Sequence, residues 1–154
     1  MEYYTTEGIV LNKIPYGECD ALYDIYTKEF GKIRARAQGV KKEGAKLKGH
    51  LEPLSLVRVT FVLGQRGERL THATLVRFWE GMRQSPERLF AGLRIAGLMN
   101  ERSFPGQKDD ALWQLVLESM LVLDEREFSE EVLRRFSDRF ASFVGIHPIT
   151  EPSL

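Results

Sequence analysis

Residues Lys32 to Leu63, KIRARAQGVKKEGAKLKGHLEPLSLVRVTFVL, contain two predicted strands separated by a long connection. In the first strand, 32–38, cations alternate with apolar residues, which places three cations on one face and three apolar groups on the other. In the second, 56–63, apolar residues alternate with arginine, threonine and valine, so one face is predicted to lie in the core and the other at least partly in water. The connection, 39–53, carries more lysines, and we expect a short helix around residues 45–51.

Three further runs outside this stretch are rich in β-branched and aromatic residues, at 9–14, 21–27 and 70–78. Residues 64–67, GQRG, join the fourth and fifth runs closely enough to form a hairpin. The fifth run does not keep one face, which indicates either a bulge or a strand covered on both sides. Five strands with a long connection between the third and fourth predict an OB-fold, a small barrel used for oligonucleotides.

The remainder of the chain has helical periodicity. Helix starts are predicted at Ser85-Pro86-Glu87, at Asp109-Asp110 and at Ser129, because a capping side chain precedes acidic residues at each. Residues 100–106 separate the first two helices, and Gly145 is expected to end the third. The predicted fold class is therefore α+β, with a five-stranded OB-fold barrel in residues 1–80 and a small helical bundle in residues 81–154.

Positive charge is concentrated in one part of a neutral chain. Residues 1–80 carry 13 basic and 10 acidic side chains, whereas residues 81–154 carry 9 and 12. Cations spaced about 6.6 Å apart along a strand, followed by a basic loop, suit a nucleic-acid backbone. The candidate DNA contacts are Lys32, Arg34, Arg36, Lys41, Lys42, Lys46 and Lys48. The alternative is a basic edge strand that keeps other chains from adding to the sheet.

Catalytic and metal sites find little support in this sequence. A single cysteine, Cys19, excludes an internal disulfide and a cysteine-based zinc site, and the three histidines are scattered. Glu18, Asp20 and Asp24 resemble a magnesium cluster, but turn capping explains the first two. We therefore predict a non-enzymatic protein without cofactor or metal. Lacking a signal peptide and any apolar run of about 20 residues, it is expected to be cytoplasmic and not bound to a membrane.

An ordered set of short patterns follows the first strand. Tyr16-Gly17-Glu18-x-Asp20 precedes a strand ending in Thr27-x-x-x-Gly31, and Ala37-x-Gly39-Val40-Lys41-Lys42 follows the basic strand. A Leu-x-Gly-x-Leu-x-Pro pattern then covers residues 47–53. This order resembles the amino-terminal domain of the RecO family, bacterial mediators of recombinational DNA repair.

The resemblance implies an OB-fold that binds single- and double-stranded DNA, promotes annealing, and works with RecR and the single-strand-binding protein to load RecA. Many family members are longer and carry a four-cysteine zinc module after a segment like 136–148. This sequence ends there, as a naturally short relative or a fragment would.

Two non-enzymatic functions remain open on the sequence alone. One is a DNA-binding mediator of the RecO type, for which the candidate base-stacking residues are Tyr16, Tyr23, Tyr26 and Phe30. The other is a protein-interaction adaptor that does not bind nucleic acid.

The predicted third helix carries a candidate site for a partner protein. Arg135 and Arg139 lie one turn apart, where they could receive the terminal carboxylate of an acidic tail such as that of the single-strand-binding protein. Ion pairing with Glu131 and Asp138 is the alternative role for these arginines.

Overall fold

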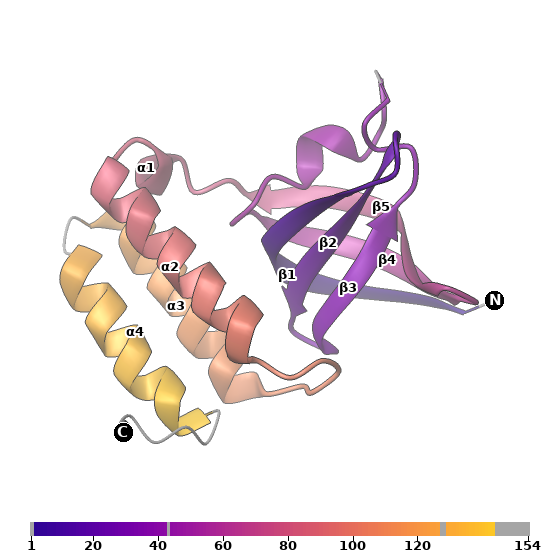
Figure 1. The fold of residues 1–154 in the computed structure, drawn as a ribbon. Coiled ribbons are helices and arrows are strands. Elements are labelled where there is room, and N and C mark those ends of the chain that lie inside the picture. The colour runs from indigo at the N-terminus through magenta and orange to yellow at the C-terminus, as the bar shows by residue number, and fades with distance from the viewer. Residues whose placement is uncertain (1, 43, 127–128, 144–154) are drawn as a thin grey trace, which may run out of the picture.

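The computed structural model describes residues 2–42, 44–126 and 129–143, and it contains a closed five-stranded barrel followed by helices (Figure 1). The strands are β1 (Tyr3–Tyr16), β2 (Asp20–Thr27), β3 (Gly31–Ala37), β4 (Leu56–Gly64) and β5 (Gly67–Arg77). Their order around the barrel is β1-β2-β3-β5-β4, with β3 and β5 parallel and the other pairs antiparallel. The α+β class and the five-stranded barrel are confirmed.

The basic strand β3 has the two faces that its alternation predicts. Ile33, Ala35 and Ala37 are buried inside the barrel, and the three cations between them point outward. In β4 the pattern fails at its end, where Leu63 is 58% exposed next to the hairpin. The fifth run contains a bulge. The consecutive β4 residues Thr60 and Phe61 pair with His72 and Leu70 of β5, so Thr71 has no partner in the register. Most β5 side chains are half-buried or exposed, so the alternative of a strand covered on both faces is wrong.

In place of the expected helix over residues 45–51, the connection between β3 and β4 has a short 3-10 turn, η1 (Lys48–His50). Gly44 adopts φ +76° and Gly49 lies inside the turn, and glycine disfavours a continuous helix. The ring of His50 fixes the turn to β5, because its Nδ1 accepts a hydrogen bond of 3.0 Å from the Leu75 amide.

In the described part of the chain, four helices follow the barrel: α1 (Glu80–Arg83), α2 (Pro86–Arg102), α3 (Asp110–Glu125) and α4 (Ser129–Phe143). The predicted caps of α2 and α3 are present, since Ser85 Oγ and Asp109 Oδ1 accept hydrogen bonds from the amides of Arg88 and Leu112. The one-turn helix α1 is too short to have a periodic signature in sequence. The expected end of α4 at Gly145 lies outside the described residues, as does the side chain of Ser129.

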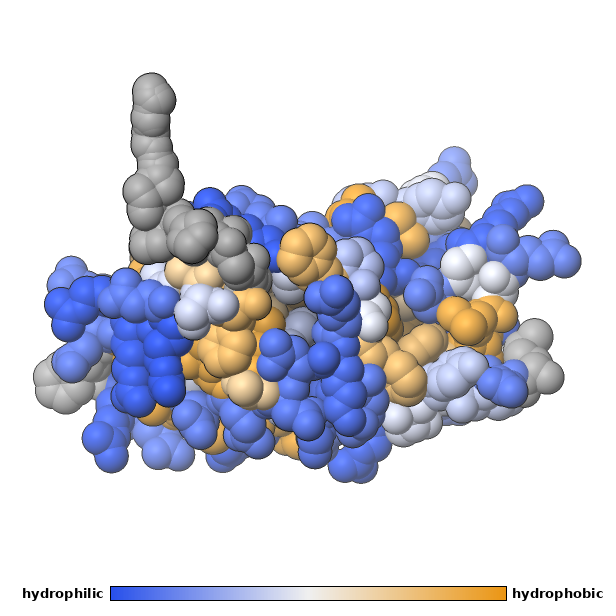
Figure 2. Space-filling view, turned by 90° about the horizontal axis from the view of Figure 1, so that it is seen from below, coloured by the Kyte–Doolittle hydropathy of each residue, from blue (hydrophilic) through white to orange (hydrophobic). Residues whose placement is uncertain are grey.

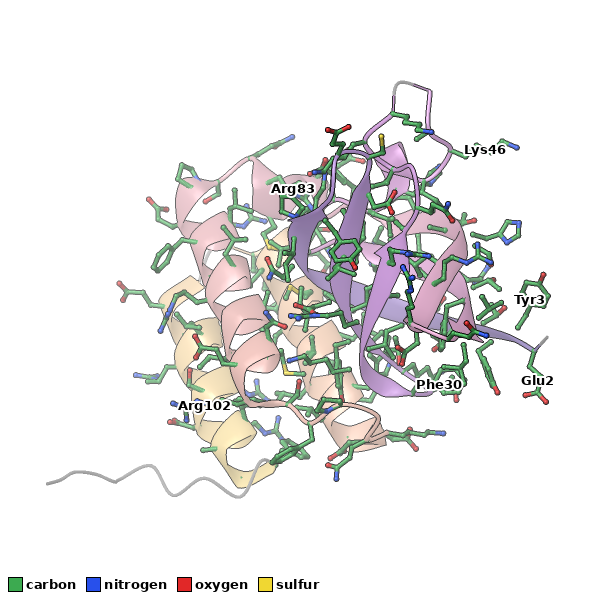
Figure 3. The ribbon with its side chains drawn as sticks, turned by 45° about the vertical axis from the view of Figure 1, so that its right-hand side comes forward. Glu2, Tyr3, Phe30, Lys46, Arg83 and Arg102 are labelled. Atoms are coloured by element: carbon green, nitrogen blue, oxygen red, sulfur yellow. The ribbon has the colours of Figure 1, made fainter. Side chains whose placement is uncertain are left out.

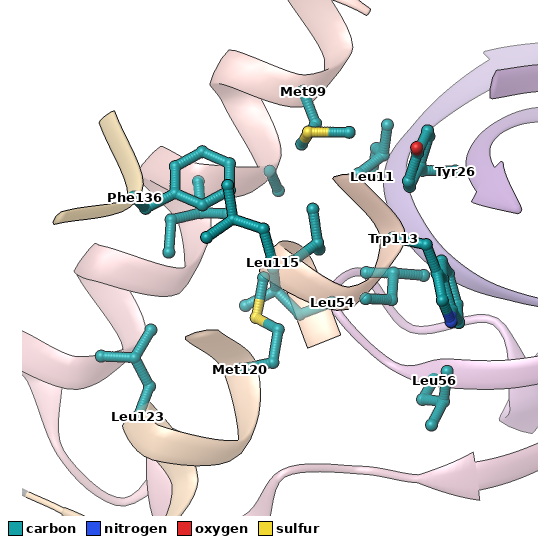
Figure 4. Close-up of a cluster of buried hydrophobic side chains, with 14 of the residues drawn as sticks. Leu11, Tyr26, Leu54, Leu56, Met99, Trp113, Leu115, Met120, Leu123 and Phe136 are labelled. Atoms are coloured by element: carbon teal, nitrogen blue, oxygen red, sulfur yellow. The ribbon is translucent and has the colours of Figure 1, made fainter. Parts of the chain in front are cut away.

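The helices stand on one side of the barrel, with α2 and α3 between α4 and the strands (Figure 1). One apolar cluster fills the barrel interior, and a second joins the outer face of β1 and β2 to the helices. In the second cluster Leu11 and Tyr26 of the barrel lie against Met99 and Trp113 of the helices (Figure 4). Within the described part of the chain, none of the helices has the length and apolarity needed to cross a membrane.

Candidate nucleic-acid interface

Arg34, in the middle of the basic strand, is engaged with a buried carboxylate. Its Nε and one terminal nitrogen donate to the two oxygens of Asp24 on β2, at 2.7 and 3.0 Å. The side chain of Asp24 is fully buried while that of Arg34 is 55% exposed, so the guanidinium covers the carboxylate from the solvent side. The hydrogen bonds and charge of Asp24 raise the pKa of Arg34. Arg34 therefore stabilises the buried carboxylate of Asp24, while about half of its own side chain remains exposed to solvent.

Lys32 is directed toward the helices. Its ammonium donates to the carbonyl oxygen of Asn100 near the end of α2, where the helix dipole favours a cation. Its own carbonyl accepts a hydrogen bond of 3.1 Å from the Gly106 amide in the loop between α2 and α3. The prediction that Lys32 lies on the same strand face as Arg34 and Arg36 is confirmed. Its ammonium group, however, is hydrogen-bonded to a helix and is not fully available to a ligand.

The remaining predicted cations lie on the connection after β3, which is anchored at its start by Asp20. The Asp20 carboxylate accepts a hydrogen bond of 2.7 Å from the Gly39 amide. This contact joins the start of β2 to the residues just after its neighbour β3, and it replaces the local turn capping expected of Asp20. Lys41 reaches the Gly17 carbonyl at 3.2 Å, whereas Lys42 and Lys46 are exposed. Figure 3 shows Lys46 extending from the end of the barrel opposite to Phe30. The side chain of Lys48 lies outside the described residues.

Arg69, which the sequence analysis missed, lies beside Arg36. The two residues are register partners on the parallel strands β3 and β5. Among the residues that the structure describes, neither arginine takes part in an ion pair. Like charges on neighbouring strands destabilise a sheet by a few tenths of a kcal/mol or more, unless an anion lies between them. The residue pattern does not indicate Arg69, because the run of β-branched and aromatic residues begins at Leu70, whereas β5 begins at Gly67.

The aromatic residues proposed for base stacking have different positions. Tyr23 and Tyr26 are 1% exposed and belong to the two apolar clusters, so their rings are core. Burial is the main cause that raises the pKa of both hydroxyls. Tyr16 is 48% exposed at the end of β1, and Phe30 is half-buried in the turn between β2 and β3. Only the last two have ring surface that a base could contact.

Arg135 and Arg139 share one face of α4, as predicted, and both line a small cavity between α3 and α4. The cavity measures about 90 Å³, and its apolar lining comes from Leu115, Val122 and Val132. Within the described ranges, neither arginine forms an ion pair with Glu131 or Asp138. Glu118 and Ser119 complete the lining, so the depression combines apolar groups with two cations and one carboxylate.

No metal-binding geometry is found in the part of the chain that the structure describes. Groups of three or more His, Cys, Asp or Glu side chains that could hold an ion are absent from those residues. Of the three acidic residues near the first turn, Asp24 is paired with Arg34 and Asp20 holds the Gly39 amide.

Comparisons with known proteins agree on one family. A family model described as "Recombination protein O N terminal" matches residues 1–79. A DNA repair protein RecO from Rubrobacter xylanophilus is 32% identical over 127 residues, which cover 82% of this chain and 51% of that protein. The RecO of Syntrophus aciditrophicus is 27% identical, covering 94% and 57%, and that of Pelotomaculum thermopropionicum 26%, covering 98% and 59%. The chain thus spans between 51% and 59% of the length of these relatives.

Proposed function

Because the chain belongs to the RecO family, we propose that it binds DNA without sequence preference through a basic face composed of Arg36, Arg69, Lys41, Lys42 and Lys46. The observation that carries the proposal is the adjacent pair Arg36 and Arg69, two cations in register on neighbouring strands. A phosphate oxygen between them would relieve their repulsion and accept hydrogen bonds from both guanidinium groups.

The shape of this face suits a polyanion and not a small anion. From Gly31 to Ala37 the strand spans about 20 Å, at roughly 3.3 Å per residue. The exposed lysines of the following loop extend the positive surface beyond it. The contacts proposed are all to the DNA backbone, which gives affinity but no sequence information. Arg34 and Lys32 are proposed as secondary contacts, since both have partners within the protein.

A salt titration tests this function. With five phosphate contacts, the slope of log K against log salt for a single strand should be about −3.5, since each contact contributes roughly −0.7. Replacing Arg36 and Arg69 together by glutamine should weaken binding and reduce the slope to about −2. The matched control is Arg135→Gln with Arg139→Gln, which removes the same charge from the helical half. A wild-type chain that shows no salt-dependent binding would favour the protein-interaction adaptor instead.

We further propose that the depression at Arg135 and Arg139 receives the end of an acidic peptide from a partner. The cavity of about 90 Å³ has room for one small apolar side chain, and the two guanidinium groups beside it can bind a terminal carboxylate. For a member of the RecO family, we propose that this partner is the single-strand-binding protein. Contacts with RecR are proposed from the family membership alone.

Calorimetry with a short acidic peptide that ends in an apolar residue checks the partner site. Wild-type protein should bind the peptide, and the Arg135→Gln, Arg139→Gln variant should lose most of that affinity. The Arg36→Gln, Arg69→Gln variant serves as the control and should bind normally. No heat at high micromolar peptide would assign the helical half a structural role only.

A further inference from the structure

A large cavity opens at the end of the barrel opposite to the exposed lysine Lys46. It measures about 590 Å³, and Tyr4 of β1, Phe30 and Phe61 of β4 contribute its aromatic wall. Arg34 of β3 and Glu68 of β5 provide polar groups at the same opening. Phe30 lies at the same end of the barrel as Tyr3 and Glu2 (Figure 3). Seen from below, the surface of the molecule has several apolar patches, drawn in orange, among blue polar side chains (Figure 2). Cavities of this size hold small organic groups in many proteins.

The three rings form one compact cluster. Tyr4 and Phe61 are stacked at 27°, and Phe30 stands nearly perpendicular to both, with all centroid separations at 5.5 Å. Phe61 is 4% exposed and belongs to the core, whereas Tyr4 and Phe30 are half-buried. The latter two therefore keep ring surface toward the cavity that a flat apolar group can cover.

Hydrogen bonds hold the Phe30 backbone in place. The Phe30 amide donates to the hydroxyl oxygen of Thr27 at 3.0 Å, and that hydroxyl donates to the Gly31 carbonyl at 2.7 Å. The amide of Gly106, in the loop between α2 and α3, donates a hydrogen bond to the carbonyl oxygen of Lys32 just beyond this turn. A ring on such an anchored turn loses little freedom when a ligand contacts it.

We infer that this cavity takes up an unstacked base of a bound single strand, with the base lying against Phe30 and Tyr4. The inference rests on the proposed DNA binding and adds a subsite to it. The strands that carry Arg36 and Arg69 on their outer face also supply Arg34 and Glu68 to the cavity, so a backbone that follows the basic face reaches its opening. The carboxylate of Glu68 offers an acceptor for an exocyclic amino group of a base.

The subsite distinguishes single strands from duplex. A base in a duplex is paired and stacked, and taking it out costs several kcal/mol, so duplex DNA is bound through the basic face alone. A single strand gains base stacking on an aromatic ring, which depends on the π-face and tolerates every base.

The experiment compares a 16-nucleotide single strand with a duplex of the same length. Phe30→Leu keeps an apolar side chain but removes the flat ring, and it should weaken single-strand binding about ten-fold while leaving duplex binding unchanged. Phe30→Tyr should restore the affinity. Phe90→Leu, at a ring 61% exposed on α2, is the matched control and should behave as wild type.

A second measurement needs no variant. An abasic 16-mer keeps every phosphate but has no base, and wild-type protein should bind it about ten-fold more weakly than the normal strand. Equal affinity for both strands, or equal losses on single strand and duplex in Phe30→Leu, would overturn the inference while the salt-dependent binding stands. Absence of DNA binding by the wild type would instead overturn the proposed function itself.

Discussion

The Arg34–Asp24 pair ties β2 to β3 through a carboxylate with no exposed surface. Two hydrogen bonds in the bidentate arrangement satisfy both oxygens of Asp24. An ionised group in this position is stable only while its partner remains, because its own hydration has been lost. Arg34 therefore contributes to the stability of the surface that the proposed interface uses.

Replacing Arg34 by alanine should destabilise the fold by about 3 kcal/mol, since it leaves the Asp24 carboxylate buried without its cation. Denaturant unfolding measures the change. Arg36→Ala is the control on the same face of β3 and should shift the free energy of unfolding by no more than about 0.5 kcal/mol. Replacing both Arg34 and Asp24 by leucine should recover most of the loss, and failure of Arg34→Ala to move the midpoint would contradict the structural role.

For single residues, the sequence predicted which side chains share a face of a strand, but not which cations have hydrogen-bond partners within the protein. Alternation along β3 requires only local geometry, and it was correct for all three cations. The partners of Lys32 and Arg34 are Asn100, 68 positions away, and Asp24 across a hairpin, so they depend on tertiary packing. Arg36 and Arg69 come together only because β3 and β5 are parallel neighbours in the barrel.

The turn between β2 and β3 contacts the loop between α2 and α3 at one end of the barrel. Gly31 adopts φ +65°, and a Cβ there would come within 2.4 Å of the Gln107 backbone in the loop between α2 and α3. Gly17, in the turn between β1 and β2, has a similar φ of +68°, but no atom lies within 4 Å of the corresponding position. Comparing substitutions at the two glycines therefore distinguishes two contributions to the free energy of unfolding. Both substitutions place a side chain on a left-handed backbone, but only the one at Gly31 also causes a steric clash.

Gly17→Ala should cost about 1 kcal/mol, the usual penalty of a left-handed conformation for a residue with a side chain. Gly31→Ala should cost at least 1 to 2 kcal/mol more, since the loop backbone has to move as well. Thermal unfolding of the two variants checks the difference. Equal losses would mean that the helical loop does not press on this turn.

Element boundaries show the limits of the sequence in another way. The caps of α2 and α3 were predicted because serine and aspartate side chains signal a start locally. The short α1 begins after Trp79, which adopts φ +62° and is 1% exposed. Its indole donates a hydrogen bond of 2.7 Å to the Leu54 carbonyl, and this tertiary contact, which no local pattern signals, accompanies the unusual backbone.

At the scale of the whole molecule, the predicted boundary near residue 80 coincides with a change from strands to helices but not with a gap in packing. Ile9, Leu11 and Tyr26 of the barrel belong to the same apolar cluster as Met99 and Trp113 of the helices. Arg83 of α1 adds hydrogen bonds to the Pro53 and Phe78 carbonyls, both at 2.6 Å. Sequence periodicity identified each apolar stripe, while the surface it covers follows only from the assembled fold.

This shared core predicts that barrel and helices unfold as one unit. A fragment of residues 1–79 would expose the outer apolar face of β1 and β2, so it should aggregate or bind a hydrophobic dye when the whole chain does not.

In the whole chain, far-ultraviolet circular dichroism follows the backbone, and fluorescence follows Trp79 and Trp113, both 2% exposed or less within the shared cluster. The two signals should give one midpoint in urea. Separate midpoints together with a soluble, cooperatively folding fragment would show that the barrel is stable by itself. The helices would then be an independent platform beside the proposed DNA-binding face.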